Sequence, residues 1–306
     1  MVHYVARRLA HTLLIVLGVV TIVFLLLQLT GDPTALYLPP DATAADRARL
    51  ARELGLERPL WVRYVEYVSR AAVGDFGQSF KFPEPAIRLV LERLPATLRL
   101  TAVAMGVSLV LAVPMAILAA VFRNSVFDLA AMSFALFGQC MPTFWLGIML
   151  ILVFSVTLGW LPPSGADDWR HYVMPALTLG LYSAAIVARL LRSSLLEIFA
   201  SDHIRTARAK GLSERVVILR HALRNASLPV VTVLGLQMGA LLGGAVVTEF
   251  VFAYPGVGRL VLQAISGRDF PVVQAFVVVT AVTISLINLL VDLAYALLDP
   301  RIRYAR

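Results

Sequence analysis

Long stretches without a charged side chain alternate along this chain with shorter segments rich in charge. A helix needs roughly 20 residues almost free of charge to cross about 30 Å of hydrocarbon. Six stretches meet this requirement, so the pattern predicts six transmembrane helices. The six charge-free stretches are 9–31, 100–122, 129–166, 171–188, 225–248 and 270–291.

The first and third stretches need interpretation. The first has an apolar run too long for a cleaved secretory signal and is followed by no small-residue cleavage site, so we expect a retained helix. The third is too long for one span and too short for two spans with a turn. Its tail, 161–165, contains two prolines and a glycine and indicates a loop. The remainder predicts one long helix with Pro142 near its middle.

Lysine and arginine set the orientation, because cytoplasmic loops carry an excess of both. With the N-terminus inside, 14 cations lie in short cytoplasmic segments and three in short outer loops. We therefore expect both termini in the cytoplasm. The cytoplasmic set is Arg7, Arg8, Arg123, Arg189, Arg192, Arg205, Arg208, Lys210, Arg215, Arg220, Arg224, Arg301, Arg303 and Arg306, and the outer set is Arg170, Arg259 and Arg268.

Composition agrees with a membrane protein. The chain is 59% hydrophobic and 15% charged, with a mean hydropathy of +0.81, whereas soluble chains are about a quarter charged. The formal net charge of +8 lies beside apolar runs, which favours contact with membrane lipid over nucleic acid. The single cysteine, Cys140, excludes an intrachain disulfide, and the five histidines show no metal-ligand spacing. We expect no metal site and no catalytic residues.

Two segments outside the spans are long enough to have structure. Residues 30–96 follow the first helix (1–29) and contain predicted helices over 44–54 and 60–65, the second with aromatic residues that favour the membrane interface. We expect a small extracytoplasmic cap that contacts a partner, the alternative being a connector. The rest, 97–306, is the predicted membrane core.

The second segment is the cytoplasmic stretch 201–225. It contains two polar-faced helical runs, 201–210 and 213–224, separated by Gly211. Glycine supplies the positive φ that ends the first run, and Ser213 can cap the second. One interpretation is a basic loop held by anionic headgroups. The other is a thin helical hairpin that enters a groove of a cytosolic partner.

This stretch also carries a family resemblance. The run from Asp202 through Leu212, with 220–225 and Leu228-Pro229, resembles the cytoplasmic EAA loop of bacterial ABC importer permeases, in its dipeptide, oligopeptide and nickel version. The general pattern is Glu-Ala-Ala, three residues, Gly, nine residues, Ile-x-Leu-Pro. Its Glu and Pro are replaced here, and the form Arg-Thr-Ala-Arg-Ala-Lys-Gly is that of the peptide branch. The ATPase-coupling positions that the resemblance implies are Arg205, Thr206, Ala207, Lys210, Gly211, Leu212, Ser213, His221 and Leu223.

The resemblance covers nearly the whole chain. Segments such as 74–79, 93–98, 142–147, 173–180, 248–258 and 298–302 look like parts of the first, or B-type, permease of these systems. The resemblance implies an all-α type I permease fold in the bacterial cytoplasmic membrane. It also implies a second related permease, two cytosolic ATPase subunits and an extracytoplasmic solute-binding protein as partners, with ATP-driven closure transmitted through the EAA loops.

The chain itself has no means of binding ATP phosphates. Its two lysines, Lys81 and Lys210, are not preceded by glycine, so no phosphate-binding Gly-Lys-Ser/Thr loop exists. We expect a non-enzymatic subunit without a cofactor, with ATP and Mg²⁺ bound by the partner ATPases. The expected solutes are peptides or similar small molecules. Nickel chelates, glutathione, haem and oligosaccharides stay open as alternatives.

Polar residues within spans mark pathways or contacts between helices. Gln139, Thr143 and Gln237 suit either role. The loop 252–258 combines Pro255 with nearby glycines, so it can re-enter the outer mouth, and we hypothesise that Tyr254, Pro255, Gly256 and Val257 gate the pathway. A secondary transporter is disfavoured, because there is no internal repeat and no carboxylate near the middle of a span.

Overall fold

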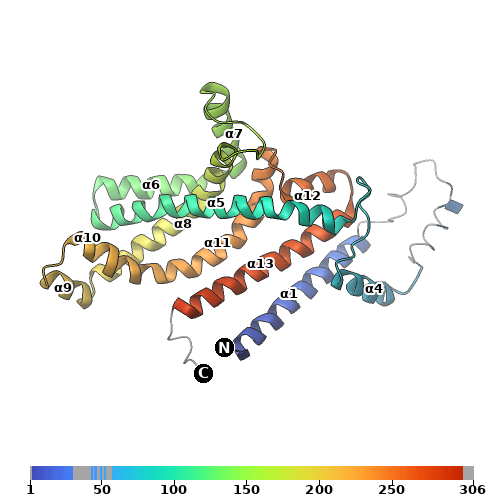
Figure 1. Ribbon diagram of the computed structural model, residues 1–306, viewed down its shortest axis with the longest axis horizontal. Coiled ribbons are helices and arrows are strands. Elements are labelled where there is room, and N and C mark those ends of the chain that lie inside the picture. The colour runs from blue at the N-terminus through green and yellow to red at the C-terminus, as the bar shows by residue number, and fades with distance from the viewer. Residues whose placement is uncertain are drawn as a thin grey trace. The chain divides into compact units, whose positions relative to one another are not determined.

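The computed structural model describes residues 2–29, 43, 45, 46, 49, 52 and 57–298, so most of the predicted cap helix 44–54 lies outside the described residues. These residues are predominantly helical, and the described part contains no strand, only an isolated bridge between Gln78 and Pro85. The α-helices are α1 (Val2–Leu29), α4 (Leu60–Ala72), α5 (Ala86–Val121), α6 (Val126–Cys140), α7 (Thr143–Leu150), α8 (Arg170–Phe199), α9 (Asp202–Ala209), α10 (Glu214–Val216), α11 (Leu223–Val251), α12 (Val257–Ser266) and α13 (Phe270–Leu298), and two π-helices, η1 (Ile151–Thr157) and η2 (Val217–Ala222), extend α7 and α10 (Figure 1).

The chain forms two compact units. One comprises residues 1–94 and 260–286, and the other comprises 95–259 and 287–306. Helix α5 is shared between them, and the predicted boundary between cap and core at residues 96 and 97 falls inside this helix.

The predicted class, an all-α membrane protein, is confirmed. Among the described residues, four helical segments are long and apolar enough to cross a membrane: Ala86–Val121, Arg170–Phe199, Glu214–Val251 and Phe270–Val291. The pair Val126–Cys140 and Thr143–Thr157 makes a fifth if it is counted as one broken span. The remaining predicted span corresponds to α1, whose described apolar part is the shorter stretch Ala10–Leu26.

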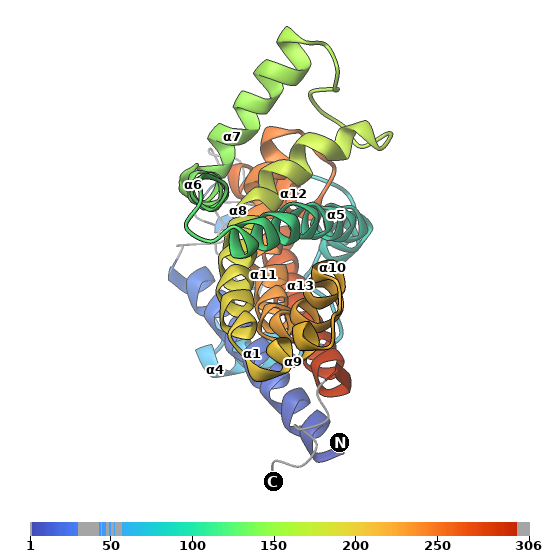
Figure 2. The same cartoon turned by 90° about the vertical axis from the view of Figure 1, so that its left-hand side faces the viewer.

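The prediction of one long helix around Pro142 is wrong. Helix α6 ends at Cys140, α7 begins at Thr143, and the two axes differ by 104°. Proline disfavours a helical conformation in the residue before it, and Met141 is indeed extended with ψ 128°. The chain therefore turns sharply at this point, as Figure 2 shows.

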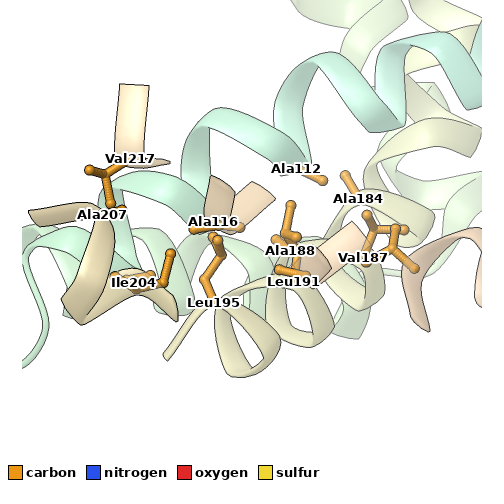
Figure 3. Close-up of a cluster of buried hydrophobic side chains, with 14 residues drawn as sticks. Ala112, Ala116, Ala184, Val187, Ala188, Leu191, Leu195, Ile204, Ala207 and Val217 are labelled. Carbon is orange, nitrogen blue, oxygen red and sulfur yellow. The ribbon is translucent and has the colours of Figure 1, made fainter. Parts of the chain in front are cut away.

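Small side chains allow the helices of the second unit to approach closely. An alanine-rich cluster joins α5, α8 and the stretch from α9 to α11, including Ala112, Ala116, Ala184 and Ala188 (Figure 3). At Gly180 a Cβ atom would lie 2.6 Å from the carbonyl oxygen of Ala104, so only glycine fits between α8 and α5. Such small-residue contacts are typical of helix packing in membranes.

A buried carboxylate organises the loop before α5 in the first unit. Asp269 is almost fully buried and accepts hydrogen bonds from the Ser79 hydroxyl and from the backbone N–H of Phe80 at 3.2 Å. The Ser79 hydroxyl oxygen in turn accepts from the N–H of Phe82 at 3.0 Å. These bonds fix the 79–85 turn against the beginning of α13.

Candidate functional site

The segment 201–225 is anchored by one buried face of α9. Ile204 and Ala207 are spaced three residues apart and are buried against Val217 and Leu195 (Figure 3). Residues three and four apart share a helix face, so the remaining residues of α9 point away from this cluster. The first predicted helix, 201–210, is confirmed within one residue at each end.

Gly211 makes the turn that follows α9. Its φ is +75°, in the left-handed region where a side chain is disfavoured. The N–H of Gly211 donates to the carbonyl of Arg208 at 2.9 Å, and the N–H of Leu212 donates to that of Ala207 at 3.4 Å. Ser213 then adopts the extended N-cap conformation, although its side chain makes no capping hydrogen bond.

The second predicted helix, 213–224, differs from the structure in where it ends. It begins at Glu214, passes through η2 and continues without a break into α11, so the prediction of an end at Arg224 is wrong. No glycine interrupts the helical sequence in this region, and Pro229 is accommodated inside α11. The segment is therefore a short helix joined by a glycine turn to the beginning of a membrane span.

An apolar stripe lies on the exposed side of this turn. Leu212, Val216 and Leu219 are all more than one third exposed and are spaced four and three residues apart. Arg205, Lys210 and Arg215 are exposed around them. Sequence reasoning missed Val216 and Leu219, although both apolar residues lie within the predicted polar-faced run 213–224.

One cation of the segment is fixed by an ion pair. The guanidinium of Arg208 donates to both carboxylate oxygens of Glu214, at 2.8 and 3.2 Å, and it lies 5.9 Å from the centre of the Phe199 ring. The hydrogen bond to Glu214 raises the pKa of Arg208. This pair bridges α9 and α10 across Gly211 and holds the turn closed.

The predicted coupling residues fall into three groups by burial. Ala207 is buried, and His221 and Leu223 are half-buried. The others are exposed, namely Arg205, Thr206, Lys210, Gly211, Leu212 and Ser213. Six of the nine predicted coupling residues are therefore exposed, on α9 and on the turn that follows it.

A second carboxylate organises the loop 252–258. Glu249 of α11 is fully buried and accepts hydrogen bonds from the Thr97 hydroxyl, from the N–H of Gly258 at 2.7 Å and from that of Arg259 at 3.2 Å. At Gly256 a Cβ atom would overlap this carboxylate, at 2.1 Å from Oε1. Glu249 thus holds the N-terminus of α12, where N–H groups lack helical partners.

The residues of the predicted gate are mostly packed inside this loop. Tyr254, Gly256 and Val257 are buried, and Pro255 is exposed. The N–H of Val257 donates to the Thr97 hydroxyl oxygen at 2.9 Å, and the Tyr254 hydroxyl donates to the carbonyl of Ala96 at 3.1 Å. The loop is therefore joined to α5 by the same threonine that binds Glu249.

The predicted pathway residues do not form one cluster. Gln139 accepts a hydrogen bond from Arg189 of α8, and Thr143 is the first residue of α7. Gln237 is buried in α11, and its Oε1 has no hydrogen-bond partner among the described residues. No hydrogen bond within the described part of the chain joins any two of the three.

Sequence reasoning also missed an ion pair between α6 and α8. Arg192 donates to both oxygens of the buried Asp128 carboxylate, at 2.7 and 2.6 Å. The N–H of Asn124 adds a third hydrogen bond at 3.0 Å. In the sequence Arg192 is only a topology signal, and the pairing cannot be seen there because 64 residues separate the partners. Within the described residues, no group of three or more His, Cys, Asp or Glu could hold a metal ion.

Comparisons with known proteins cover nearly the entire chain. A family model described as the inner membrane component of binding-protein-dependent transport systems matches residues 112–304, and its N-terminal counterpart matches residues 1–101. The chain is 44% identical over 305 residues to the glutathione transport system permease protein GsiC of Escherichia coli K12, covering 99% of this chain and 100% of that protein. The GsiC proteins of Salmonella typhi and Shigella dysenteriae show the same identity and coverage.

Solved structures support the same fold. A chain of the MetNI methionine ABC transporter in an inward-facing conformation superimposes with a TM-score of 0.61 at 21% identity, covering 71% of this chain and 100% of that one. A second crystal form of that transporter gives a TM-score of 0.61 at 20% identity, with the same coverage of both chains.

Proposed function

Because this chain belongs to the inner-membrane components of binding-protein-dependent transport systems and is a pore-forming permease subunit of an ABC importer, we propose that residues 201–225 dock onto a cytosolic ATPase subunit. The sequence prediction of a coupling loop motivates the proposal. The exposed stripe of Leu212, Val216 and Leu219 beside the glycine turn is the observation that carries it.

The two faces of the segment explain how it can transmit force. Ile204 and Ala207 hold α9 to the alanine-rich cluster, so the stripe is fixed relative to α8 and α11. An apolar stripe that water would otherwise cover gains about 25 cal/mol per Å² when a partner buries it. The cations around it suit a cleft lined by carboxylates, which adds specificity.

The proposal includes the partners of the complex. Two cytosolic ATPase subunits bind ATP and Mg²⁺, a second related permease completes the pore, and an extracytoplasmic binding protein delivers the solute. This chain contributes no cofactor and no catalytic group. The EAA-loop resemblance and the 44% identity to GsiC support this assignment.

For the solute, we propose a peptide-like molecule, with glutathione as the first to test, because the relatives found are named for glutathione transport. Other short peptides are the next choice. Nickel chelates, haem and oligosaccharides are the alternatives. Affinity measurements on the cognate binding protein decide among them.

We also propose that Tyr254, Pro255, Gly256 and Val257 lie at the outer end of the solute pathway. Hydrogen bonds to Glu249 and Thr97 attach this loop to α11 and α5. The loop therefore moves with these helices. We propose that this motion opens and closes the outer end of the pathway. Gln139, Thr143 and Gln237 remain candidates for the pathway wall.

Photo-crosslinking tests the docking site directly. A photoreactive phenylalanine analogue at Leu212 should crosslink to the ATPase subunit in the assembled complex. The same analogue at Val126, an exposed residue on the first turn of α6, is the matched control and should not. Crosslinks from Val126 alone, or none from Leu212 in a complex that assembles normally, would refute docking by this segment.

A further inference from the structure

Helix α4 has an apolar arc wider than its neighbour covers. At 100° per residue, Tyr64, Tyr67 and Ala71 fall on one half of this arc, and Trp61 and Val65 fall on the other. The opposite side of the helix carries Arg63, Glu66, Ser69 and Arg70. This division into an apolar and a charged side is typical of helices that lie in a membrane interface.

The first half of the arc packs on α1. The rings of Tyr64 and Tyr67 lie 5.4 and 5.6 Å from the ring of Phe24, centre to centre. The Tyr64 hydroxyl also forms a hydrogen bond of 2.7 Å with the Thr21 hydroxyl. Two aromatic contacts and a hydrogen bond therefore fix α4 to α1 at the position of Thr21 and Phe24.

The position of this contact along α1 gives an estimate of its depth in the bilayer. Thr21 and Phe24 follow the start of the charge-free stretch at Leu9 by 12 and 15 residues, which corresponds to about 18 and 22 Å along a helix. The hydrocarbon layer is about 30 Å thick. With Leu9 taken as the inner boundary and α1 along the bilayer normal, the α1 residues that α4 contacts thus lie roughly 8–12 Å below the outer boundary. Interfacial helices bury their apolar face to about 5–10 Å, so the two depths nearly agree.

Within the described residues, the second half of the arc is exposed. Trp61 is 70% exposed and Val65 is 60% exposed. Helix α1, the predicted first membrane span, likewise exposes Ile22, Leu25 and Leu26. Both helices of this pair therefore expose large apolar side chains.

The charged side of α4 is satisfied by ion pairs. Arg58 donates to Glu66 at 3.2 Å, and Arg70 donates to Asp75 at 2.9 Å. All four side chains are more than half exposed. A helix placed between water and hydrocarbon needs such a side facing the headgroups, and tryptophan is enriched at this level.

We propose that α4 lies in the outer leaflet interface and places Trp61 and Val65 among lipid acyl chains. Lipid is the occupant because α4 packs on the predicted first membrane span, which exposes large apolar side chains of its own, and because the estimated depth along α1 matches that of interfacial helices. The helix then anchors the middle of the extracytoplasmic segment to the membrane surface, independently of how the permease couples to its ATPase.

Spin labels on adjacent residues test the proposal in the assembled complex in lipid nanodiscs. After Cys140→Ala removes the native cysteine, one label replaces Val65 and the matched control replaces Glu66 on the charged side. The label at Val65 should collide more often with oxygen than with a water-soluble nickel complex, and the label at Glu66 should show the reverse.

Two outcomes overturn the proposal. If nickel reaches both labels, α4 lies in water above the membrane. If neither reagent reaches the label at Val65 and its motion is frozen, a protein partner covers this flank. Quenching of Trp61 fluorescence by lipids brominated near the headgroup, in a variant with the other three tryptophans replaced by phenylalanine, provides the second measurement, and absence of quenching counts against lipid contact.

Discussion

Replacing Gly211 with valine perturbs the turn between α9 and α10 without adding a steric clash, since a Cβ atom at this position would meet nothing within 4 Å beyond the adjacent residues. The whole effect then comes from the backbone, because φ is +75°. A β-branched residue in this region costs of order 1–3 kcal/mol. Such an energy lowers the population of the observed turn by about 5–150-fold relative to alternatives. We expect normal membrane insertion, weaker retention of ATPase subunits and loss of ATP-driven uptake.

Two matched variants separate the effect of backbone strain at residue 211 from the effect of a larger side chain. Gly211→Asn keeps a residue that tolerates the left-handed region, so it should retain most of the uptake. Ala209→Val adds the same side chain two residues earlier at an exposed helical position and should also be active. The assay is solute uptake in proteoliposomes, together with the amount of ATPase that copurifies. Equal uptake by Gly211→Val and the wild type would refute the reasoning.

Two further predictions concern the buried carboxylates of the second unit. Glu249→Ala leaves the N–H groups of Gly258 and Arg259 without an acceptor, which costs about 1–3 kcal/mol for each unsatisfied group. The complex should therefore unfold at a lower temperature, and a cysteine at residue 257 should react faster with an impermeant thiol reagent. An unchanged reaction rate would contradict this prediction. Asp128→Ala leaves the half-buried Arg192 charge without its partner, which should lower the yield of assembled complex. Exchange of the two residues should restore the yield if the pair acts as a unit.

The membrane spans could be predicted because their cause is local. A charge in hydrocarbon is costly at any position, so charge-free length alone located four of the helices. The break at Met141 could not be predicted in the same way. Pro95, Pro114, Pro175 and Pro229 all lie inside helices, so a proline in an apolar stretch does not by itself distinguish a continuous helix from a broken one. The packing around the proline determines whether the helix continues or breaks.

The same distinction between local causes and long-range packing applies to the candidate site. Gly211 could be placed at a turn because its reason is local backbone geometry. The partners of Glu249 and Asp128 could not be found, since 152 residues separate Thr97 from Glu249 and 64 separate Asp128 from Arg192. A lone carboxylate near the end of an apolar stretch indicates that some partner exists. Only the fold shows which one.

The continuity of η2 with α11 has a mechanical consequence. Helix α11 contains 29 residues, which corresponds to about 44 Å, and it connects η2 at one end with Glu249 near the other. No loop interrupts it, so a displacement of the helix beyond Pro229, where a bend is possible, carries both ends of that part together. A tilt of about 10° would shift one end by roughly 8 Å relative to the other along a rod of this length. One continuous helix thus joins the segment that follows Gly211 to the loop 252–258, and it is long enough to cross a bilayer.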